Sequence, residues 1–275
     1  MQIIEAKQFR IVFQPVVKLP EGEIYGYEAL VRLPEGSCFA SPLQLFNFAA
    51  EAGLLYPLER VTREEALRHL GLFSLKHKLF LNINPQIIND PRFIPGQTAR
   101  FVRQYNLTPE NIVFEITEGM AIKDFPAFRK TLDHYRSQGY LIAIDDFGAG
   151  YSNLRTVAEL QPDFIKLDMS LVHGVHKKTA LQALMETLRT FACKIHSQLI
   201  AEGIENEAEL MKLVQLGIPF GQGYLLAQPA FPPPMLDRKA AEVLQHAGAA
   251  QGFGRKMHNK PHGAAAERVS LFLED

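Results

Sequence analysis

Residues 11–33 read IVFQPVVKLPEGEIYGYEALVRL, and their pattern predicts how the first two strands are connected. Two runs rich in apolar, β-branched and aromatic residues, Ile11–Val17 and Ile24–Leu33, flank a short segment that contains Pro20 and Gly22. Runs of this composition predict β-strands. The segment between them is too short for a helical crossover, so it predicts a tight turn between two antiparallel strands.

The rest of the chain alternates between strand and helix patterns. Six further runs predict strands, at Leu79–Ile83, Asn111–Thr117, Leu141–Phe147, Phe164–Leu167, Gln198–Glu202 and Phe220–Leu226. Apolar residues at intervals of three or four predict helices at Pro42–Ala52, Pro57–Phe73, Phe93–Tyr105, Phe125–Ser137, Leu181–Lys194 and Ala208–Leu216. Strands separated by helices form parallel βαβ units, and eight strands over this length fit a closed barrel.

The fold predicted from both patterns is an α/β fold, a modified (β/α)8 TIM-type barrel with one antiparallel strand. The alternative is an open doubly wound sheet, but the chain lacks a glycine-rich fingerprint after its first strand.

The composition changes after Gln228. The run Phe231-Pro232-Pro233-Pro234 cannot continue a helix or a central strand, so we expect the barrel to occupy residues 1–235. Residues 236–275 are expected to hold a C-terminal helix, Asp237–Ala247, and then a linker-like tail. The tail ends on an apolar run, Val269–Leu273, which either docks on a regulatory partner or begins a further module.

Charge and cysteine content exclude several classes of protein. The 275 residues carry 29 Lys and Arg against 30 Asp and Glu, a balance that argues against non-specific binding to a nucleic-acid polymer. The two cysteines, Cys38 and Cys193, lack CxxC spacing, so neither a disulfide framework nor a thiolate zinc site is expected. The N-terminus lacks a signal-peptide core and no apolar run has the length of a membrane span, so we expect a cytoplasmic protein without a membrane partner.

Residues that can carry chemistry lie at the ends of the predicted strands. They are Glu28, Asn82, Glu115, Glu118, Asp145, Asp146, Lys166, Asp168, Glu202 and Gln222. The C-terminal ends of barrel strands converge on one face, where carboxylates repel one another unless cations neutralise them. Oxygen ligands without His or Cys favour Mg²⁺ or Mn²⁺ over Zn²⁺. Two such metals bridged by a carboxylate are the usual apparatus for in-line attack on a phosphodiester.

Each of these residues also has a purely structural interpretation. A lone Glu28 is typical of a solvated strand position, Asn82 can cap a turn, and an isolated Lys166 is often a surface residue. The pair Asp145-Asp146 is the strongest single signal, because consecutive carboxylates at the end of a buried strand are costly. The coincidence of these residues on successive strands favours a functional site.

The segment Tyr27-Glu28-Ala29-Leu30-Val31-Arg32 resembles the signature after which the EAL-domain cyclic-di-GMP phosphodiesterases are named. Further motifs of that family follow over about residues 8–232: Gln14-Pro15, Leu81-Asn82-Ile83, Glu115-Ile116-Thr117-Glu118, Asp145-Asp146-Phe147-Gly148, Ile165-Lys166-Leu167-Asp168, Ala201-Glu202-Gly203-Ile204-Glu205 and Gln222-Gly223-Tyr224.

The resemblance implies a barrel with an antiparallel strand that hydrolyses one phosphodiester bond of cyclic di-GMP to give linear pGpG. It implies a first Mg²⁺ or Mn²⁺ on Glu28, Asn82, Glu115 and Asp145, and a second on Asp145, Asp146 and Glu202. It also implies that Lys166 orients or activates the attacking water, and that Glu118 anchors the loop after Asp146. The residues that would contact the ligand or support its pocket are Gln14, Arg32, Asp168, Glu205 and Gln222.

The chain departs from the family pattern in the loop after Asp146. Ala149 stands where Thr is common and Asn153 where Ser is common, which leaves open how a dimer contact would couple to metal binding. No departure removes an implied metal ligand, so we expect an active enzyme. The resemblance also implies a homodimer with a contact near this loop. The alternatives are a non-catalytic cyclic-di-GMP receptor with the same barrel and a different Mg²⁺-dependent barrel enzyme.

Overall fold

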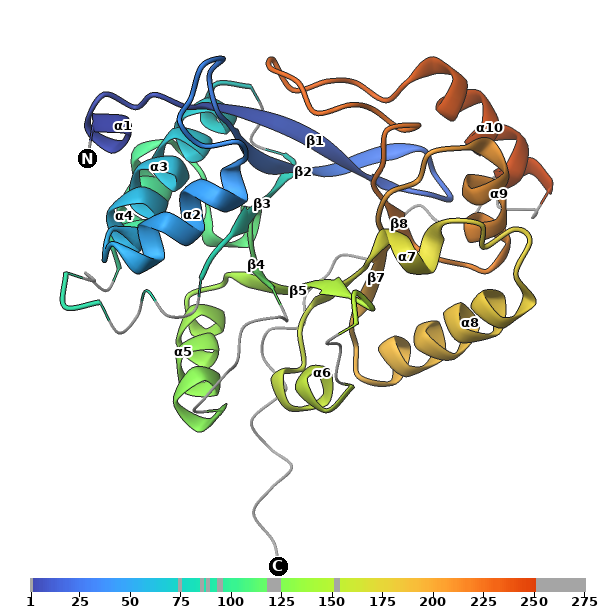
Figure 1. Cartoon of the computed structure of the whole chain (residues 1–275). Coiled ribbons are helices and arrows are strands. Elements are labelled where there is room, and N and C mark those ends of the chain that lie inside the picture. The colour runs from blue at the N-terminus through green and yellow to red at the C-terminus, as the bar shows by residue number, and fades with distance from the viewer. Residues whose placement is uncertain are drawn as a thin grey trace, which may run out of the picture.

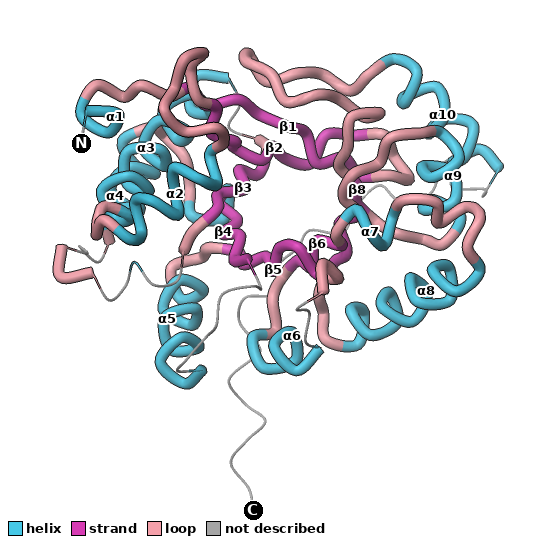
Figure 2. The backbone as a smooth tube through the Cα atoms, viewed as in Figure 1, coloured by secondary structure: helices cyan, strands magenta, loops and turns pink. Residues whose placement is uncertain are grey.

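The computed structural model describes residues 2–73, 76–84, 87, 90–92, 96–117, 125–150 and 154–250. In this part of the chain eight strands form a closed barrel, which Figure 2 shows as a ring with helices outside it. The strands are β1 (Arg10–Lys18), β2 (Glu23–Arg32), β3 (Lys78–Asn82), β4 (Ile112–Thr117), β5 (Leu141–Phe147), β6 (Phe164–Leu167), β7 (Gln198–Ala201) and β8 (Phe220–Gly221).

Helices follow most of the strands and pack around the barrel (Figure 1). They are α1 (Gln2–Glu5), α2 (Pro42–Glu51), α3 (Leu55–Phe73), α4 (Gln97–Gln104), α5 (Phe125–Ser137), α6 (Leu154–Leu160), α7 (Met169–Val172), α8 (Thr179–Lys194), α9 (Glu207–Gln215) and α10 (Arg238–Ala250), with a 3-10 turn at Pro109–Asn111. The six helices predicted between strands are all present, whereas the short helices α1, α6 and α7 were not predicted. None of the described helices combines the length and the apolar character needed to cross a bilayer.

Strand β1 runs antiparallel to both of its neighbours, β2 and β8. The other neighbouring strands pair in parallel. The turn that reverses the chain is closed by a hydrogen bond from Gly22 N to Lys18 O at 2.8 Å, and Gly22 has a φ of 68°, which glycine adopts without a steric penalty. The predicted modified barrel with one antiparallel strand is therefore confirmed.

Strand β8 is much shorter than predicted. The predicted strand ran to Leu226, but the ladder with β7 ends at Gly221. The chain beyond it approaches the backbone of Ile204 so closely that a Cβ atom at Gly223 would lie 2.2 Å from Ile204 N. The segment instead exchanges backbone hydrogen bonds with the end of β7, from Gln222 N to Ala201 O at 2.8 Å and from Ile204 N to Gln222 O at 3.1 Å.

Two apolar layers enclose the strands. The larger lies between the barrel and its helices and includes Ala240 and Leu244 of α10. The smaller fills one end of the barrel interior and consists of Val16, Phe80, Val113, Ala143, Phe164, Ile200 and Phe220, with Tyr25 packed against it. Side chains two positions apart on a strand point to the same face, so this inner layer fixes which residues face the barrel axis at the other end. The domain boundary at residue 235 stays a prediction.

Candidate active site

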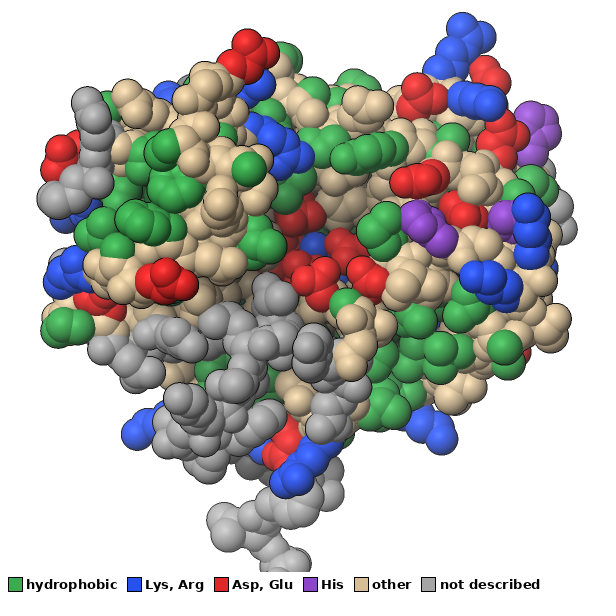
Figure 3. All heavy atoms as spheres, viewed as in Figure 1, with side chains coloured by type: hydrophobic (Ala, Val, Ile, Leu, Met, Phe, Trp, Pro, Cys, Tyr) green, Lys and Arg blue, Asp and Glu red, His purple; other side chains and the backbone are tan. Residues whose placement is uncertain are grey.

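A layer of polar side chains lies next to the inner apolar layer. On β3 to β7 the polar residue comes two positions after the inward apolar residue: Asn82 after Phe80, Glu115 after Val113, Asp145 after Ala143, Lys166 after Phe164 and Glu202 after Ile200. On β1, which runs the other way, Gln14 comes two positions before Val16. The alternation of side chains along each strand therefore directs these groups to one end of the barrel. Figure 3 shows acidic side chains gathered around a hollow in this face, with basic atoms at its bottom.

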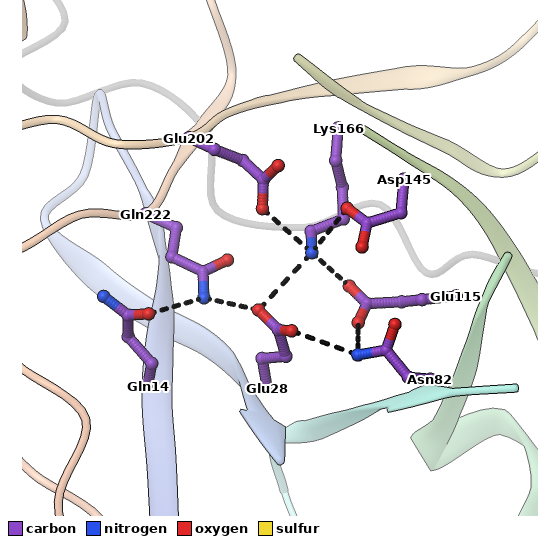
Figure 4. A network of polar contacts seen from close by, with 8 residues as sticks. All are labelled: Gln14, Glu28, Asn82, Glu115, Asp145, Lys166, Glu202 and Gln222. Carbon is purple, nitrogen blue, oxygen red and sulfur yellow. Dashed lines mark hydrogen bonds and ion pairs between the residues drawn. The ribbon is translucent and has the colours of Figure 1, made fainter. Parts of the chain in front are cut away.

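Lys166 is at the centre of the cluster (Figure 4). Its Nζ atom lies 2.7 Å from Glu115 Oε1, 2.9 Å from Glu202 Oε1, 3.0 Å from Asp145 Oδ1 and 3.4 Å from Glu28 Oε2. Only 1% of the lysine is exposed. The interpretation of Lys166 as a surface residue is therefore wrong, and the side chain is a buried counter-ion to four carboxylates.

Glu28 is oriented by amide side chains on both of its oxygens. Asn82 Nδ2 donates to Glu28 Oε1 and to Glu115 Oε2, both at 3.2 Å. Gln222 Nε2 donates to Glu28 Oε2 at 2.7 Å and to Gln14 Oε1 at 3.1 Å. Residues from β1 to β4 and from the segment after β8 thus form one continuous hydrogen-bond network.

The consecutive residues Asp145 and Asp146 both contribute to the site. Neighbouring strand residues normally point to opposite faces, but the register between β5 and β6 shifts between Ile144 and Phe147, and Asp146 has a φ of 57°. Aspartate tolerates this left-handed conformation better than most residues. As a result, carboxylate oxygens of Asp145, Asp146 and Glu202 lie within 4.8 Å of one another.

The cluster holds more negative than positive charge. Burial, followed by the charge of Glu28, raises the pKa of Glu115 well above its usual value. Burial also raises the pKa of Glu202 to about 8, and burial together with the adjacent Asp145 raises the pKa of Asp146 to about 6. Burial alone would lower the pKa of Lys166, but the surrounding carboxylates raise it well above its usual value, so the ammonium stays charged.

The donor set fits divalent cations. Glu115 Oε1 and Asp145 Oδ1 are buried and lie close to Lys166, yet neither accepts a hydrogen bond of good geometry from a described residue. Carboxylate and amide oxygens that are crowded, under-satisfied and short of positive charge are the ligands that Mg²⁺ and Mn²⁺ prefer. The described site residues include no His or Cys, which would favour Zn²⁺.

Three predicted pocket residues lie apart from this network. Arg32 lines a cavity of about 470 Å³ between the barrel and helices α2 and α3, and Asn82 of the network lines the same cavity. Asp168 caps α7 by accepting a hydrogen bond from Ser170 N at 2.9 Å. Glu205 is exposed, with its Oε1 atom 3.8 Å from His173 Nε2. Among the interactions of the described residues, none joins these three side chains to Lys166 or Glu28.

Glu118, the predicted anchor of the loop after Asp146, lies outside the described residues, as does Asn153. Conversely, Glu59 was not predicted from the sequence. It is a buried carboxylate on α3 that accepts a hydrogen bond from Asn84 N at 2.9 Å. Its spacing of four residues from Arg63 resembles an ordinary surface ion pair on a helix, so only its burial distinguishes it.

Comparison with known families decides what this barrel is. The model of the EAL domain family matches residues 1–229. The chain belongs to the EAL-domain family.

Relatives of this EAL domain include a cyclic di-GMP phosphodiesterase of Pseudomonas aeruginosa, PA2567, which is 30% identical over 233 residues. That match covers 83% of this chain and 40% of the relative, so the chain spans less than half of that protein.

Solved structures show the same fold. A standalone EAL protein from Vibrio cholerae in its c-di-GMP-bound form matches with a TM-score of 0.75 and 30% identity, over 85% of this chain and 97% of that one. BlrP1 of Klebsiella pneumoniae, in a complex with manganese and cyclic di-GMP, matches with a TM-score of 0.74 and 31% identity, over 81% of this chain and 56% of that one.

Proposed function

We propose that this EAL domain is a metal-dependent phosphodiesterase that hydrolyses cyclic di-GMP to linear pGpG. The observation that carries the proposal is the polar cluster itself, in which Lys166 contacts four carboxylates at one end of the barrel. Relatives that carry the name of cyclic di-GMP phosphodiesterases, and structural neighbours bound to this nucleotide, supply the substrate class.

Two sets of ligands fit the arrangement. Glu28, Asn82, Glu115 and Asp145 would hold a first cation. Asn82 Nδ2 donates to Glu28 and Glu115 in the metal-free site, and the amide would turn to present Oδ1 to the cation. Asp145, Asp146 and Glu202, whose oxygens lie close together, would hold a second. Such a pair, when bound, supplies an activated water and offsets the charge that develops on the phosphate oxygens. We propose Mg²⁺ or Mn²⁺ as the metal.

Lys166 would act as a hydrogen-bond donor. Because its surrounding carboxylates keep the ammonium protonated, it has no lone pair with which to accept a proton from water. It can instead orient the attacking water or stabilise negative charge on the phosphate in the transition state. Burial among carboxylates fixes its position before substrate arrives.

The substrate would lie over the polar layer. Gln14 and Gln222, which are buried beside Glu28, would support the floor of the pocket. Arg32 would meet a phosphate through its planar donor fork, and Glu205 could accept hydrogen bonds from a guanine edge. Asp168 would act indirectly, because in this structure it caps helix α7.

The proposal is tested by incubating the purified protein with cyclic di-GMP and either Mg²⁺ or Mn²⁺, followed by chromatography of the nucleotides. Linear pGpG is the expected product. Cyclic di-GMP that is bound but recovered intact would favour a receptor, and an absence of binding would favour a different barrel enzyme. Glu205→Gln, a substitution at an exposed position, should change the affinity for cyclic di-GMP and leave the rate of the hydrolysis step unchanged.

A further inference from the structure

A buried ion pair lies on helix α3, outside the polar cluster. Glu59 is 4% exposed and Arg63 is 8% exposed, and Glu59 Oε2 lies 3.4 Å from Arg63 Nη2. Arg63 Nη1 donates a hydrogen bond of 2.8 Å to Thr98 Oγ1 on helix α4. The pair therefore joins two neighbouring helices beneath the protein surface.

Stabilisation of the fold does not by itself explain why this ion pair is buried. Removing two charges from water costs several kcal/mol per ion, and a buried pair commonly stabilises a fold no better than apolar residues of similar volume. Glu59 and Arg63 line the same cavity as Asn82 and Asn84, so the pair lies beside the end of β3. Burial also raises the pKa of Glu59 to about 7, because removal from water disfavours the charged form.

The second carboxylate oxygen of Glu59 binds the main chain just beyond β3, the strand that carries Asn82. Glu59 Oε1 accepts a hydrogen bond from the backbone N–H of Asn84 at 2.9 Å. Asn84 follows the end of β3 by two residues, and β3 ends at Asn82. Beyond that strand end, Ile83 N still donates to Glu115 O at 2.9 Å, and the Glu59 carboxylate holds the N–H of the residue after it, Asn84.

The hydrogen bonds of Ile83 N and Asn84 N restrain the preceding residue, Asn82. The Asn82 side chain connects Glu28 and Glu115, yet Asn82 is itself an exposed residue at the last position of its strand. A side chain at a strand end keeps its direction only if the following peptides are held. In this chain, Glu59 supplies that hold from a different element.

We propose that Glu59 is a positioning residue that fixes the end of β3, directs the Asn82 amide toward Glu28 and Glu115, and thereby sets the affinity for the first divalent cation. Arg63 keeps the carboxylate turned toward Asn84. The consequence for the cation rests on the proposed function, whereas the anchoring of Asn84 does not.

The chain offers a matched control on the same helix. Glu65 is 8% exposed and forms ion pairs with Arg68, at 2.7 Å, and with Lys7. Its hydrogen bonds within the described residues go to these two side chains and not to β3. Glu65→Ala therefore removes a largely buried, paired carboxylate from α3 without removing an anchor of the active-site strand.

Two measurements on the full chain test the proposal. In metal-free protein, Glu59→Ala should speed hydrogen exchange at the Asn84 amide at least about tenfold, whereas Glu65→Ala should leave it unchanged. In a Mn²⁺ titration followed by the electron paramagnetic resonance of free Mn²⁺, Glu59→Ala should weaken binding about tenfold, which is the usual scale for losing a partner that orients a ligand. Glu59→Gln, which retains an acceptor oxygen for the Asn84 N–H, should stay within about threefold of the wild type.

Unchanged exchange at Asn84 in Glu59→Ala would overturn the anchoring role. Equal loss of Mn²⁺ affinity in Glu59→Ala and Glu65→Ala would overturn it too, because the effect would then be general destabilisation. A Glu59→Gln variant as weak as Glu59→Ala would show that charge and not the acceptor matters, which also contradicts the proposal. A wild type that binds no Mn²⁺ contradicts the proposed function and the cation effect together, and the exchange measurement still decides the anchor.

Discussion

Lys166 is the residue at which ligand binding and chemistry are most easily separated. Its positive charge is unsuited to holding cations, but its position among four carboxylates suits it to a donor role in the transition state. We expect Lys166→Ala to lower kcat at least about 10²-fold, the scale on which a positioned catalytic group acts. Binding of cyclic di-GMP in the presence of Ca²⁺, measured by calorimetry, should persist. Turnover at the wild-type rate would refute the assigned role.

Glu28 should behave differently, because we assign it as a direct ligand. Removing its carboxylate leaves Asn82 and Gln222 without their shared acceptor and deletes one oxygen donor of the first cation site. Glu28→Ala should lose turnover together with the tightening of nucleotide binding that metal causes. Calorimetric titrations with and without Mn²⁺ measure this directly. A variant whose nucleotide affinity still rises with Mn²⁺ would show that Glu28 is not a required ligand.

Sequence reasoning predicts the central residues because each follows from the strand pattern. Glu115, Asp145 and Lys166 stand two positions beyond a buried apolar residue, and the alternation of a strand is enough to place them on one face. Alternation could not show that Asp146 joins them, since that depends on a register shift in β5. It could not identify Glu59 either, because its burial is a property of packing between elements.

Among the elements, the eighth strand is the one whose length the composition predicts poorly. The run from Phe220 has the residues of a strand, but Gly223 lies against the backbone of Ile204 at distances that admit no Cβ atom. A contact between two backbones leaves no trace in hydrophobic periodicity. The hairpin, in contrast, was predictable because the length of the segment around Gly22 alone excludes a crossover.

This close approach gives a prediction about stability. A Cβ atom at position 223 would meet the backbone N and O atoms of Ile204 at 2.2 and 2.3 Å, and backbone cannot rotate away as a side chain can. Gly223→Ala should therefore destabilise the protein by about 2 kcal/mol or more, and it should displace the loop that follows Glu202. Gly36→Ala is the control. Gly36 also has a positive φ, but a Cβ atom added there would have no neighbouring atom within 4 Å, so this substitution should destabilise the protein by only about 1 kcal/mol. Urea denaturation measures both; equal losses would contradict the packing argument.

At the scale of the whole molecule, we expect the domain to form a homodimer through the region of the loop after Asp146. The helix that follows this loop, α6, begins at Leu154, which is 50% exposed. Gly148 and Gly150 have φ values of 108° and 111°, a backbone conformation that is disfavoured for residues other than glycine. Light scattering across a range of protein concentrations should show a dimer whose dissociation lowers activity. A monomer that is fully active at every concentration would contradict this expectation.

The barrel as a whole places an excess of carboxylates at one end and an apolar layer at the other, and we propose that divalent cations neutralise the carboxylates. The most direct test is the rate of pGpG formation by protein stripped with EDTA, measured as Mg²⁺ or Mn²⁺ is added back in steps. We expect no turnover without metal and a rise to saturation as metal is added. Turnover that does not depend on metal, or cyclic di-GMP recovered intact at every metal concentration, would contradict it.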